Sequence, residues 1–281
     1  MKVLSLFALA LSCLFSSQAV ACPSVAAIPD VNCDGNARVA VIGDSVVFGI
    51  GDTVNNGRGG YVRRIVSKFP GVWFDNLGRP GEETRRLITV IEDAFAGTGE
   101  TDVANALTRA DIVIIDIGRN DWWKFGPPLA TWRNLKRIRE LIQLKVEAVT
   151  GHKPFVVTAQ LMGANRTGQG AWVAELVKLI AANNKSSAPT DLRFNSVSKK
   201  LLADRVHPSS LGYEQLTKVL ALYLRVTLPK HVALVMRDLD QDGLYDEFEA
   251  EKFGTDPKKA DTDGDGIVDG EDKAPTQKGR I

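Results

Sequence analysis

The segment ADIVIIDIG, residues 110–118, constrains the fold of this chain more than any other part of its sequence. Its central residues, Ile112 to Ile115, are all apolar and lack the polar alternation that a sheet with one solvated face shows. An unbroken apolar run fits a strand in a parallel sheet that is covered on both faces. We therefore expect an α/β fold.

The neighbouring segments alternate between strand and helix patterns. Three further strands are predicted over residues 37–43, 72–78 and 153–161. Helices are predicted over residues 59–69, 82–95, 129–149, 170–185 and 209–228. This order implies a parallel sheet with right-handed crossovers, in which ligands bind at the carboxyl ends of the strands.

The N-terminus has the layout of a secretory signal peptide. Lys2 precedes an apolar stretch that is too short to be a good spanning helix, and an Ala-x-Ala pattern follows at Ala19–Ala21. We expect residues 1–21 to be removed and the protein to be secreted, periplasmic or at the cell surface, as in an exported bacterial protein. A buried N-terminal helix is the alternative interpretation. No later apolar run is long enough to cross a bilayer.

Removal of residues 1–21 would leave two cysteines, Cys22 and Cys33. An even pair in an exported protein suggests a disulfide that closes a short N-terminal loop. The alternative is that Cys22 carries a lipid as the first mature residue. Ala19 stands where a lipoprotein signal usually has leucine, which favours the disulfide.

Charge is distributed unevenly along the chain. The formal net charge is +1, from 35 basic and 34 acidic residues, yet residues 238–272 hold 14 acidic and only 3 basic residues. An acidic module therefore follows a basic body. Such a body either favours anionic surfaces and polysaccharides or carries its lysines and arginines as solvated decoration. The sequence has no nucleic-acid-binding motif, so nucleic acid is not an expected partner.

A serine follows the first predicted strand in the segment Gly-Asp-Ser, residues 43–45. A serine hydroxyl becomes a good nucleophile only when a neighbouring base takes its proton. Of the three histidines, only His207 has an acid at a suggestive spacing, Asp204 three residues before it. In a tight turn Asp204 can bind Nδ1–H of the imidazole and leave Nε2 facing Ser45, which is the logic of a catalytic triad.

Two further segments follow predicted strands and offer hydrogen-bond donors for a developing oxyanion. Gly81, in NLGRPGEET, can present its backbone N–H without a side chain in the way. Asn120, in IGRND, offers a side-chain amide. With the backbone N–H of Ser45 these would make three convergent donors. Taken one at a time, the same residues could instead be helix caps, a turn glycine and a surface ion pair.

The four blocks occur in the order typical of one family. Gly-Asp-Ser, a glycine in an NxGxxGxxT-like stretch, Gly-x-Asn-Asp and Asp-x-x-His-Pro together resemble the SGNH (GDSL-type) hydrolases over residues 38–224. The resemblance implies a three-layer α/β/α flavodoxin-like fold and serine-dependent ester hydrolysis, with no cofactor for catalysis. It assigns the nucleophile to Ser45, the base to His207, the orienting acid to Asp204, and the oxyanion hole to Ser45, Gly81 and Asn120.

The identity of the ester stays open. The partner is expected to be a small-molecule, polysaccharide or lipid ester, so lipase, carbohydrate deacetylase and thioesterase are all alternatives. Arg119 occupies the variable position of Gly-x-Asn-Asp, and Trp122 and Trp123 follow directly. The tryptophans either form an apolar or sugar-stacking platform or belong to the core. The oligomeric state also stays open.

Two other classes of protein compete with this interpretation. A dinucleotide-binding fold needs G-x-G-x-x-G straight after the first strand, and GDSVVFG does not provide it. A calcium-dependent adhesion or carbohydrate-binding protein could carry a non-catalytic α/β domain. The complete set of proposed catalytic residues argues against that loss of activity.

Two acidic segments repeat a calcium-loop pattern. Residues 238–249 and 261–272 place oxygen-bearing side chains at loop positions one, three, five, nine and twelve, with a glycine at position six and a backbone carbonyl at position seven. The predicted ligands are Asp238, Asp240, Asp242, Leu244, Asp246 and Glu249 in the first loop, and Asp261, Asp263, Asp265, Ile267, Asp269 and Asp272 in the second. A solvated acidic tail is the alternative interpretation.

The segments after these loops lack the flanking helices of EF-hands. The region resembles bacterial thrombospondin type 3-like calcium repeats, with a dockerin as the second choice, so Ca²⁺ is expected as a structural ion. Residues 30–35 form the first half of a similar loop, but no acid follows at its twelfth position. The predicted organisation is a signal peptide over 1–21, a hydrolase domain over 22–228, a linker over 229–237, calcium repeats over 238–275 and a tail over 276–281.

Overall fold

The computed structural model divides the chain into two compact units, one spanning Cys22–Leu234 and the other containing Val235–Ile281. It describes residues 24–26, 28–32, 34–54, 59–123, 126–184, 192–229, 239–240, 242, 249, 253–270, 272 and 274–277. The predicted signal peptide and both cysteines of the predicted disulfide, Cys22 and Cys33, lie outside the described residues.

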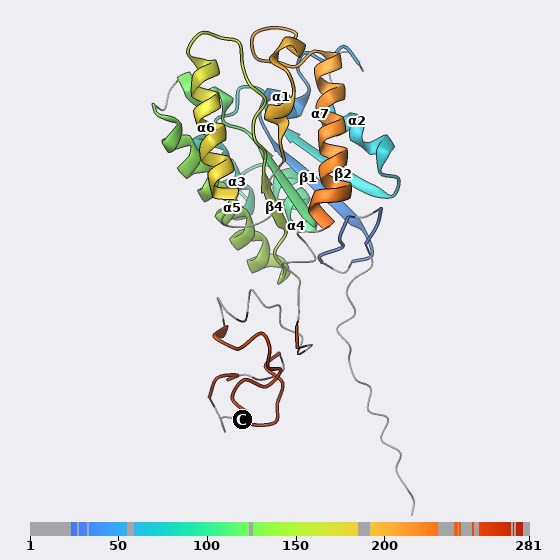
Figure 1. The fold of residues 1–281 in the computed structure, drawn as a ribbon, viewed down its shortest axis with the longest axis vertical. Helices are drawn as coiled ribbons and strands as arrows, with labels where there is room; N and C mark the ends of the chain where they lie inside the picture. The colour runs from blue at the N-terminus through green and yellow to red at the C-terminus, as the bar shows by residue number, and fades with distance from the viewer. Residues whose placement is uncertain are drawn as a thin grey trace, which may run out of the picture. The chain divides into compact units, whose positions relative to one another are not determined.

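Four parallel strands form the sheet of the larger unit (Figure 1). They are β1 (Ala37–Gly43), β2 (Val72–Gly78), β3 (Ile112–Asp116) and β4 (Phe155–Thr158), in the spatial order β2-β1-β3-β4. The predicted parallel sheet is therefore confirmed. At its carboxyl edge, Gly43 of β1 pairs with Gly78 of β2 and with Asp116 of β3. The segments that follow these three strands consequently start side by side.

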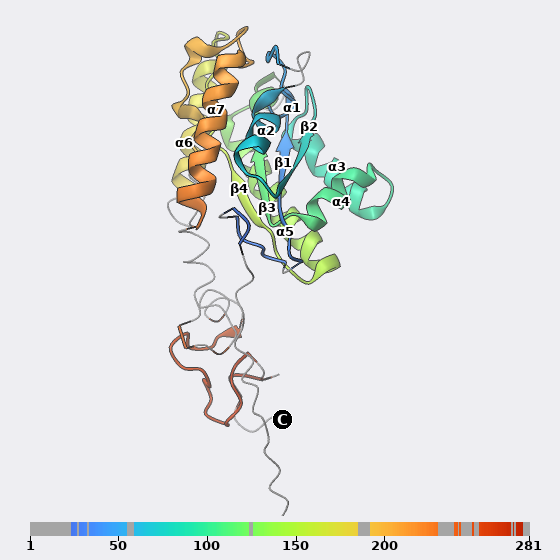
Figure 2. The same cartoon turned by 90° about the vertical axis from the view of Figure 1, so that its right-hand side faces the viewer.

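One face of the sheet carries four helices, and Figure 2 shows helices on either side of the strands. The helices α3 (Thr84–Ala96), α4 (Thr101–Arg109), α5 (Pro128–Thr150) and α6 (Gln169–Asn184) share an apolar core with the sheet. Alternate strand residues enter this core, Ala40 and Ile42 from β1 and Val113 and Ile115 from β3. The residues between them are also fully buried. Both faces are therefore covered, which explains the missing polar alternation.

Among the residues of the larger unit that the structure describes, the other α-helices are α1 (Ser45–Phe48), α2 (Gly60–Ile65) and α7 (Ser210–Leu222). Helix α1 leaves β1 directly, and α2 packs against both α1 and α7. Tyr61 of α2 and Tyr213 of α7 are fully buried. Helix α1 begins at Ser45, and α7 begins just after His207. These two helices therefore start at or beside the predicted nucleophile and base.

Several element boundaries differ from the predictions, and three of the differences are informative. Helix α4 was not predicted, although Val103, Ala106 and Leu107 line its buried side. It has only 9 residues, and short helices are stabilised mainly by tertiary packing, so its local pattern is weak. The strand predicted over 153–161 is limited to β4. The helix predicted over 209–228 is α-helical only to Leu222, after which Tyr223–Thr227 forms a π-helical turn.

In the smaller unit, the described residues 254–270 form bends and turns. Gly264 and Gly266 have φ angles of 76° and 98°, the left-handed region that glycine adopts without a Cβ clash. In the described part of the chain, no helix is long and apolar enough to cross a membrane.

Candidate active site

Ser45 is the first residue of α1 and is 7% exposed. The helix is capped not by Ser45 but by Asp44, whose carboxylate accepts a hydrogen bond from Val46 N at 2.9 Å. The alternative interpretation of Ser45 as a helix cap is therefore wrong. After one turn the helix ends at Gly49, which has a φ of 104°. The serine hydroxyl is thus free for a partner outside its own helix.

That partner is His207, which lies 162 residues further along the chain. Its Nε2 is 2.9 Å from Ser45 Oγ, and its Nδ1 is 2.7 Å from Asp204 Oδ2. The other carboxylate oxygen of Asp204 accepts the backbone N–H groups of Val206 and His207 at 2.6 and 2.7 Å. The structure therefore brings Ser45, His207 and Asp204 into one hydrogen-bonded series.

The charge of Asp204 fixes the direction of these hydrogen bonds. Burial alone would raise the pKa of Asp204, but the hydrogen bonds from the imidazole and backbone of His207 and from Val206 N outweigh it and lower that pKa. Asp204 is therefore a carboxylate that only accepts, so Nδ1 of His207 donates to it. The neutral imidazole then has Nε2 as its acceptor, facing the hydroxyl of Ser45.

Gly81 lies in a turn between β2 and α3, closed by Glu82 N donating to Arg79 O at 3.0 Å. Its φ is 77°, and a Cβ at this position would meet nothing within 4 Å. Backbone conformation, rather than lack of space, is therefore the reason for glycine here. The turn is tied to the end of β1 because Arg79 N donates to Gly43 O at 2.9 Å.

Asn120 joins this turn to the segment after β3. Its Nδ2 donates to Glu82 O at 2.8 Å. An amide nitrogen carries two hydrogens, so this bond orients the side chain and leaves a second N–H as a donor. The structure therefore places Asn120 against the neighbour of Gly81, and both follow strands whose ends flank that of β1.

Asp121 anchors the 3₁₀ helix Arg119–Trp123 that carries Asn120. It is fully buried and accepts hydrogen bonds from Thr84 N at 2.9 Å, from Thr84 Oγ1 and from Thr131 Oγ1 at 2.9 Å. Burial raises the pKa of Asp121, and these hydrogen bonds oppose the rise. The partners of Asp121 could not be predicted from the sequence, since they come from α3 and α5 and no local pattern indicates them.

A second buried charge network lies behind the serine. Arg119 is 2% exposed, and its guanidinium donates to Asp116 at 2.8 Å and to Asp44 at 3.3 Å. Tyr61 Oη donates to the other oxygen of Asp116 at 2.9 Å. Burial disfavours the Arg119 cation, but the two carboxylates outweigh it and raise its pKa. The residue at the variable position thus links the segments of Ser45 and Asn120.

Trp122 and Trp123 differ in exposure. Trp123 is 59% exposed, and the Arg166 guanidinium lies 4.8 Å from its ring centroid. Trp122 is partly buried and packs on Trp123 with ring centroids 4.4 Å apart. The loop of Arg166 also reaches the loop of the proposed base, because Asn165 N donates to Arg205 O at 2.8 Å. The exposed indole is therefore a surface feature and not a core residue.

In the smaller unit, two clusters of acidic side chains match the predicted calcium loops in part. Carboxylate oxygens of Asp240, Asp242 and Glu249 lie within 4.8 Å of one another, as do those of Asp261, Asp263 and Asp265. The predicted ligands Asp238, Leu244 and Asp246 lie outside the described residues.

In the second loop, acidic side chains accept hydrogen bonds from the backbone of the loop itself. Asp261 accepts backbone N–H groups from Gly264, Asp265 and Gly266 at 2.7, 3.2 and 2.9 Å. Asp265 Oδ1 accepts from Ile267 N at 3.0 Å. Asp272, at the last loop position, accepts from Ala274 N at 2.8 Å, outside the loop.

Two buried carboxylate oxygens of this loop have no hydrogen-bond partner among the residues that the structure describes. Asp269 is 3% exposed, and its Oδ1 accepts from Thr262 N at 2.8 Å. Its Oδ2 is buried and accepts no hydrogen bond from any residue that the structure describes, and the same holds for Asp263 Oδ2. Buried carboxylate oxygens without a donor are costly unless a cation neutralises them, so the chemistry of the loop fits a hard cation.

Comparisons with known proteins agree with this architecture. A model of the GDSL-like lipase/acylhydrolase family matches residues 41–215. A solved aryl esterase from M. smegmatis is 17% identical, with a TM-score of 0.55, over 68% of this chain and 99% of that one. A carbohydrate acetylesterase from Sinorhizobium meliloti is 16% identical, with a TM-score of 0.55, over 66% and 97%.

A third structure, a member of the lipolytic protein G-D-S-L family from Veillonella parvula, is 18% identical, with a TM-score of 0.53, over 68% of this chain and 98% of that one. At these identities the similarity shows a shared fold. A comparison with curated proteins gives no match.

Proposed function

The chain belongs to the GDSL-like lipase/acylhydrolase family and is a serine ester hydrolase, and we propose that it acts through an acyl-enzyme on Ser45. The observation that carries this proposal is the series of hydrogen bonds from Asp204 to His207 and from His207 to Ser45, at 2.7 and 2.9 Å. A weak nucleophile, a base and a group that orients the base are the parts that covalent ester hydrolysis needs.

In the first half-reaction, His207 Nε2 takes the hydroxyl proton of Ser45 while Oγ bonds to the carbonyl carbon of the ester. The bond from that carbon to the alcohol oxygen then breaks, and the alcohol leaves with the proton from His207. In the second half-reaction, His207 takes a proton from water as the water oxygen attacks the acyl carbon. The carboxylic acid leaves, and the proton returns to Ser45 Oγ. Asp204 holds the imidazole and stabilises its cation in both halves.

The oxyanion that forms in each half-reaction needs donors that are already in place. We assign this role to the backbone N–H groups of Ser45 and Gly81 and to the side-chain amide of Asn120. Two observations support the assignment. Asn120 Nδ2 keeps one hydrogen after its bond to Glu82 O, and the three strand ends before these donors are paired neighbours in the sheet. Preorganised donors of this kind act mainly on the transition state.

We propose that exposed Trp123 contacts a ring in the substrate. It stands three residues after Asn120 in a 3₁₀ helix, where residues i and i+3 lie on the same side. A flat indole face can stack on an aryl or sugar ring, and Arg166 adds a cation beside it. Two of the similar structures are described as an aryl esterase and a carbohydrate acetylesterase, which is consistent with such a substrate.

The enzyme is proposed to be exported. The support is the signal-peptide pattern of residues 1–21 and the even pair of cysteines that its removal would leave. Mass spectrometry of the mature N-terminus tests this proposal. A mass that begins at Cys22 and is two hydrogens lighter than the reduced chain supports the Cys22–Cys33 disulfide, and a diacylglyceryl adduct on Cys22 excludes it.

The two acidic loops are proposed to be structural Ca²⁺ sites of the thrombospondin type 3-like kind. The clustered carboxylates and the unpartnered buried oxygen of Asp269 support a cation in the second loop. Its ligands would be the side chains of Asp261, Asp263, Asp265, Asp269 and Asp272 and the carbonyl of Ile267. Ca²⁺ would neutralise these carboxylates and order the segment. No step of ester hydrolysis depends on it.

Replacement of Ser45 by alanine tests the nucleophile. Hydrolysis of a short-chain nitrophenyl ester and labelling by a fluorophosphonate should both disappear in Ser45→Ala, while circular dichroism stays that of the wild type. Ser67→Ala is a matched control, because Ser67 is exposed and donates to Arg64 O in its own turn. Wild-type turnover in Ser45→Ala would refute the acyl-enzyme.

A further inference from the structure

The distance between Ser45 Oγ and His207 Nε2 depends on contacts made by other residues of the two segments. The two side chains come from segments 162 residues apart, and a single hydrogen bond of 2.9 Å joins them. Nucleophilic catalysis is sensitive to this geometry, since a misplacement of about 1 Å can cost roughly a hundredfold in rate. The contacts that hold the segment after Ser45 against the segment after His207 therefore affect the chemistry.

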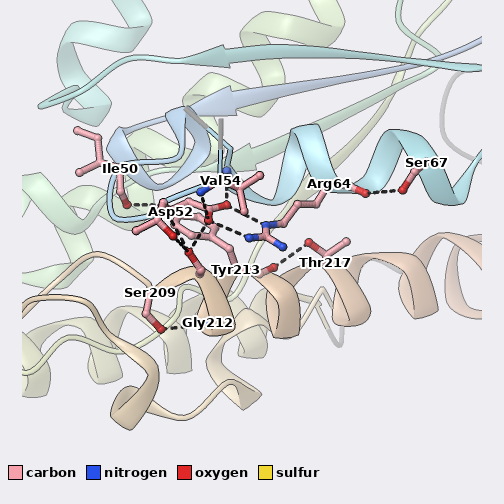
Figure 3. A network of polar contacts seen from close by, with 12 residues as sticks. Ile50, Asp52, Val54, Arg64, Ser67, Ser209, Gly212, Tyr213 and Thr217 are labelled. Atoms are coloured by element: carbon pink, nitrogen blue, oxygen red, sulfur yellow. Dashed lines mark hydrogen bonds and ion pairs between the residues drawn. The ribbon is translucent and has the colours of Figure 1, made fainter. Parts of the chain in front are cut away.

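Asp52 is the centre of these contacts (Figure 3). It lies seven residues after Ser45 in the sequence, and its side chain has no exposed surface. Oδ1 accepts from Ser210 Oγ at 2.7 Å, from Arg64 Nη2 at 2.8 Å and from Val54 N at 3.2 Å. Oδ2 accepts from Arg64 Nε at 2.8 Å and from Gly60 N at 2.9 Å. One carboxylate thus joins the α1–α2 loop, α2 and α7.

Ser210 connects Asp52 to the segment of the base. It is the first residue of α7 and stands three residues after His207. Besides donating to Asp52, its hydroxyl accepts from Thr53 N at 2.9 Å and lies 2.8 Å from Thr53 Oγ1. Any shift of the start of α7 relative to the loop after α1 would break these bonds together.

Tyr213 makes the second connection between the same two segments. Its hydroxyl donates its one hydrogen to Ile50 O at 2.7 Å and also lies 3.2 Å from Val46 O, so it contacts both α1 and the loop after it. Between these contacts the two backbones approach closely. A Cβ on Gly51 would lie 2.4 Å from Pro208 O and 3.2 Å from His207 Cβ, and Gly51 has a φ of 95°. Only glycine permits this approach.

We propose that Asp52, acting with Ser210 and Tyr213, is a positioning residue that fixes the distance between Ser45 Oγ and His207 Nε2. The inference rests on the proposed roles of Ser45 and His207. A carboxylate suits this position because five donors converge on it, and an amide cannot accept all five. In either orientation, the NH₂ group of an asparagine at residue 52 would face at least two of the N–H donors from Val54, Gly60 and Arg64.

Two hydroxyl deletions test the proposal without disturbing the buried ion pair. Ser210→Ala and Tyr213→Phe each remove one connection and keep the Asp52–Arg64 pair. We expect each to lower kcat by about tenfold to about a hundredfold, with KM nearly unchanged, because the hydroxyls position the reacting groups and do not bind the ester. The rate of fluorophosphonate labelling should fall in proportion, since it uses the same serine and base. Ser210→Thr, which keeps the hydroxyl, should restore most of the rate.

Thr217→Val is the matched control. Thr217 lies in α7, is 1% exposed, and donates to Tyr213 O of its own helix at 2.7 Å (Figure 3). The substitution removes a buried hydroxyl from α7 without touching the connection to α1, so kcat should stay that of the wild type. Each variant is assayed at a temperature at which circular dichroism shows it to be folded.

The outcomes separate this inference from the proposed function. If Ser45→Ala is inactive while Ser210→Ala and Tyr213→Phe keep wild-type kcat and labelling rates, the positioning role is refuted and the nucleophile stands. Equal losses in Thr217→Val and Ser210→Ala would also refute it, because general loosening of α7 would then be the cause. If Ser45→Ala keeps its activity, the proposed function itself fails. Asp52→Asn should show the largest loss, and the two hydroxyl variants decide the test if it does not fold.

Discussion

Removal of the Asn120 amide should isolate the contribution of one oxyanion donor. The Nδ2 group has two hydrogens, and the bond to Glu82 O at 2.8 Å occupies one of them. The second is available only while that bond holds the amide in place. Asn120→Ala therefore removes a preorganised donor, a loss that typically lowers kcat by about 10² to 10³, or about 3–4 kcal/mol of transition-state stabilisation.

The kinetic pattern distinguishes a transition-state donor from a substrate-binding group. A donor aimed at the oxyanion stabilises the transition state more than the ground state, so kcat should fall and KM should change little. Asn120→Asp should be at least as damaging, because it keeps the shape but offers an anion where negative charge develops. The assay is initial-rate hydrolysis of a short-chain nitrophenyl ester across a range of concentrations.

Asn134→Ala is the control variant, which distinguishes loss of the Asn120 donor from loosening of the residues that hold its helix. Asn134 Nδ2 donates to Thr84 Oγ1 at 2.9 Å, and Thr84 also binds Asp121, which anchors the helix of Asn120. The control removes an identical amide and loosens only the support, so it should cost much less than Asn120→Ala. Normal kcat with a raised KM in Asn120→Ala, or equal losses in the two alanine variants, would refute the donor role.

Three further outcomes are expected. Burial opposes the charge of Asp52, but its hydrogen bonds from Arg64 and Ser210 lower its pKa to about 2, so its stabilisation is present above about pH 4 and lost as the pH falls through about 2. The free energy of unfolding, measured with denaturant, should fall more steeply over that pH range in the wild type than in Asp52→Asn. Equal slopes of this free energy against pH would contradict the prediction. Trp123→Ala should raise KM for aryl or sugar esters but not for a methyl ester of the same acid, and an equal effect on both would exclude ring stacking. EGTA should open residues 238–272 to protease while leaving turnover of a small ester intact, and parallel loss of both would make calcium part of catalysis.

The architecture and the candidates for catalysis could both be predicted from the sequence. An apolar strand without polar alternation fits a parallel sheet that is covered on both faces, so ADIVIIDIG predicts such a sheet. The strand ends then placed Ser45, Gly81 and Asn120 at one edge. His207 could be selected because few histidines compete and because Asp204 lies within one turn of it, which is a local pattern.

Helix α4 is an element that the local sequence pattern does not predict. Its 9 residues bury only Val103, Ala106 and Leu107, and a run this short gives a periodicity that chance can also produce. Its stability comes from the core that it shares with α3 and α5. A short helix of this kind can be assigned only when the elements that pack against it are known.

The groups that hold the catalytic residues in register could be identified only from the folded structure. Three charged residues each bind at least one partner from another segment of the chain. Arg119 binds Asp44 and Asp116, Asp121 binds Thr84, and Asp52 binds Ser210. In the sequence, no local pattern shows that these charged side chains are buried rather than solvated. A buried charge is tolerated only when partners surround it. Those partners are brought together by the fold and are not neighbours in the sequence.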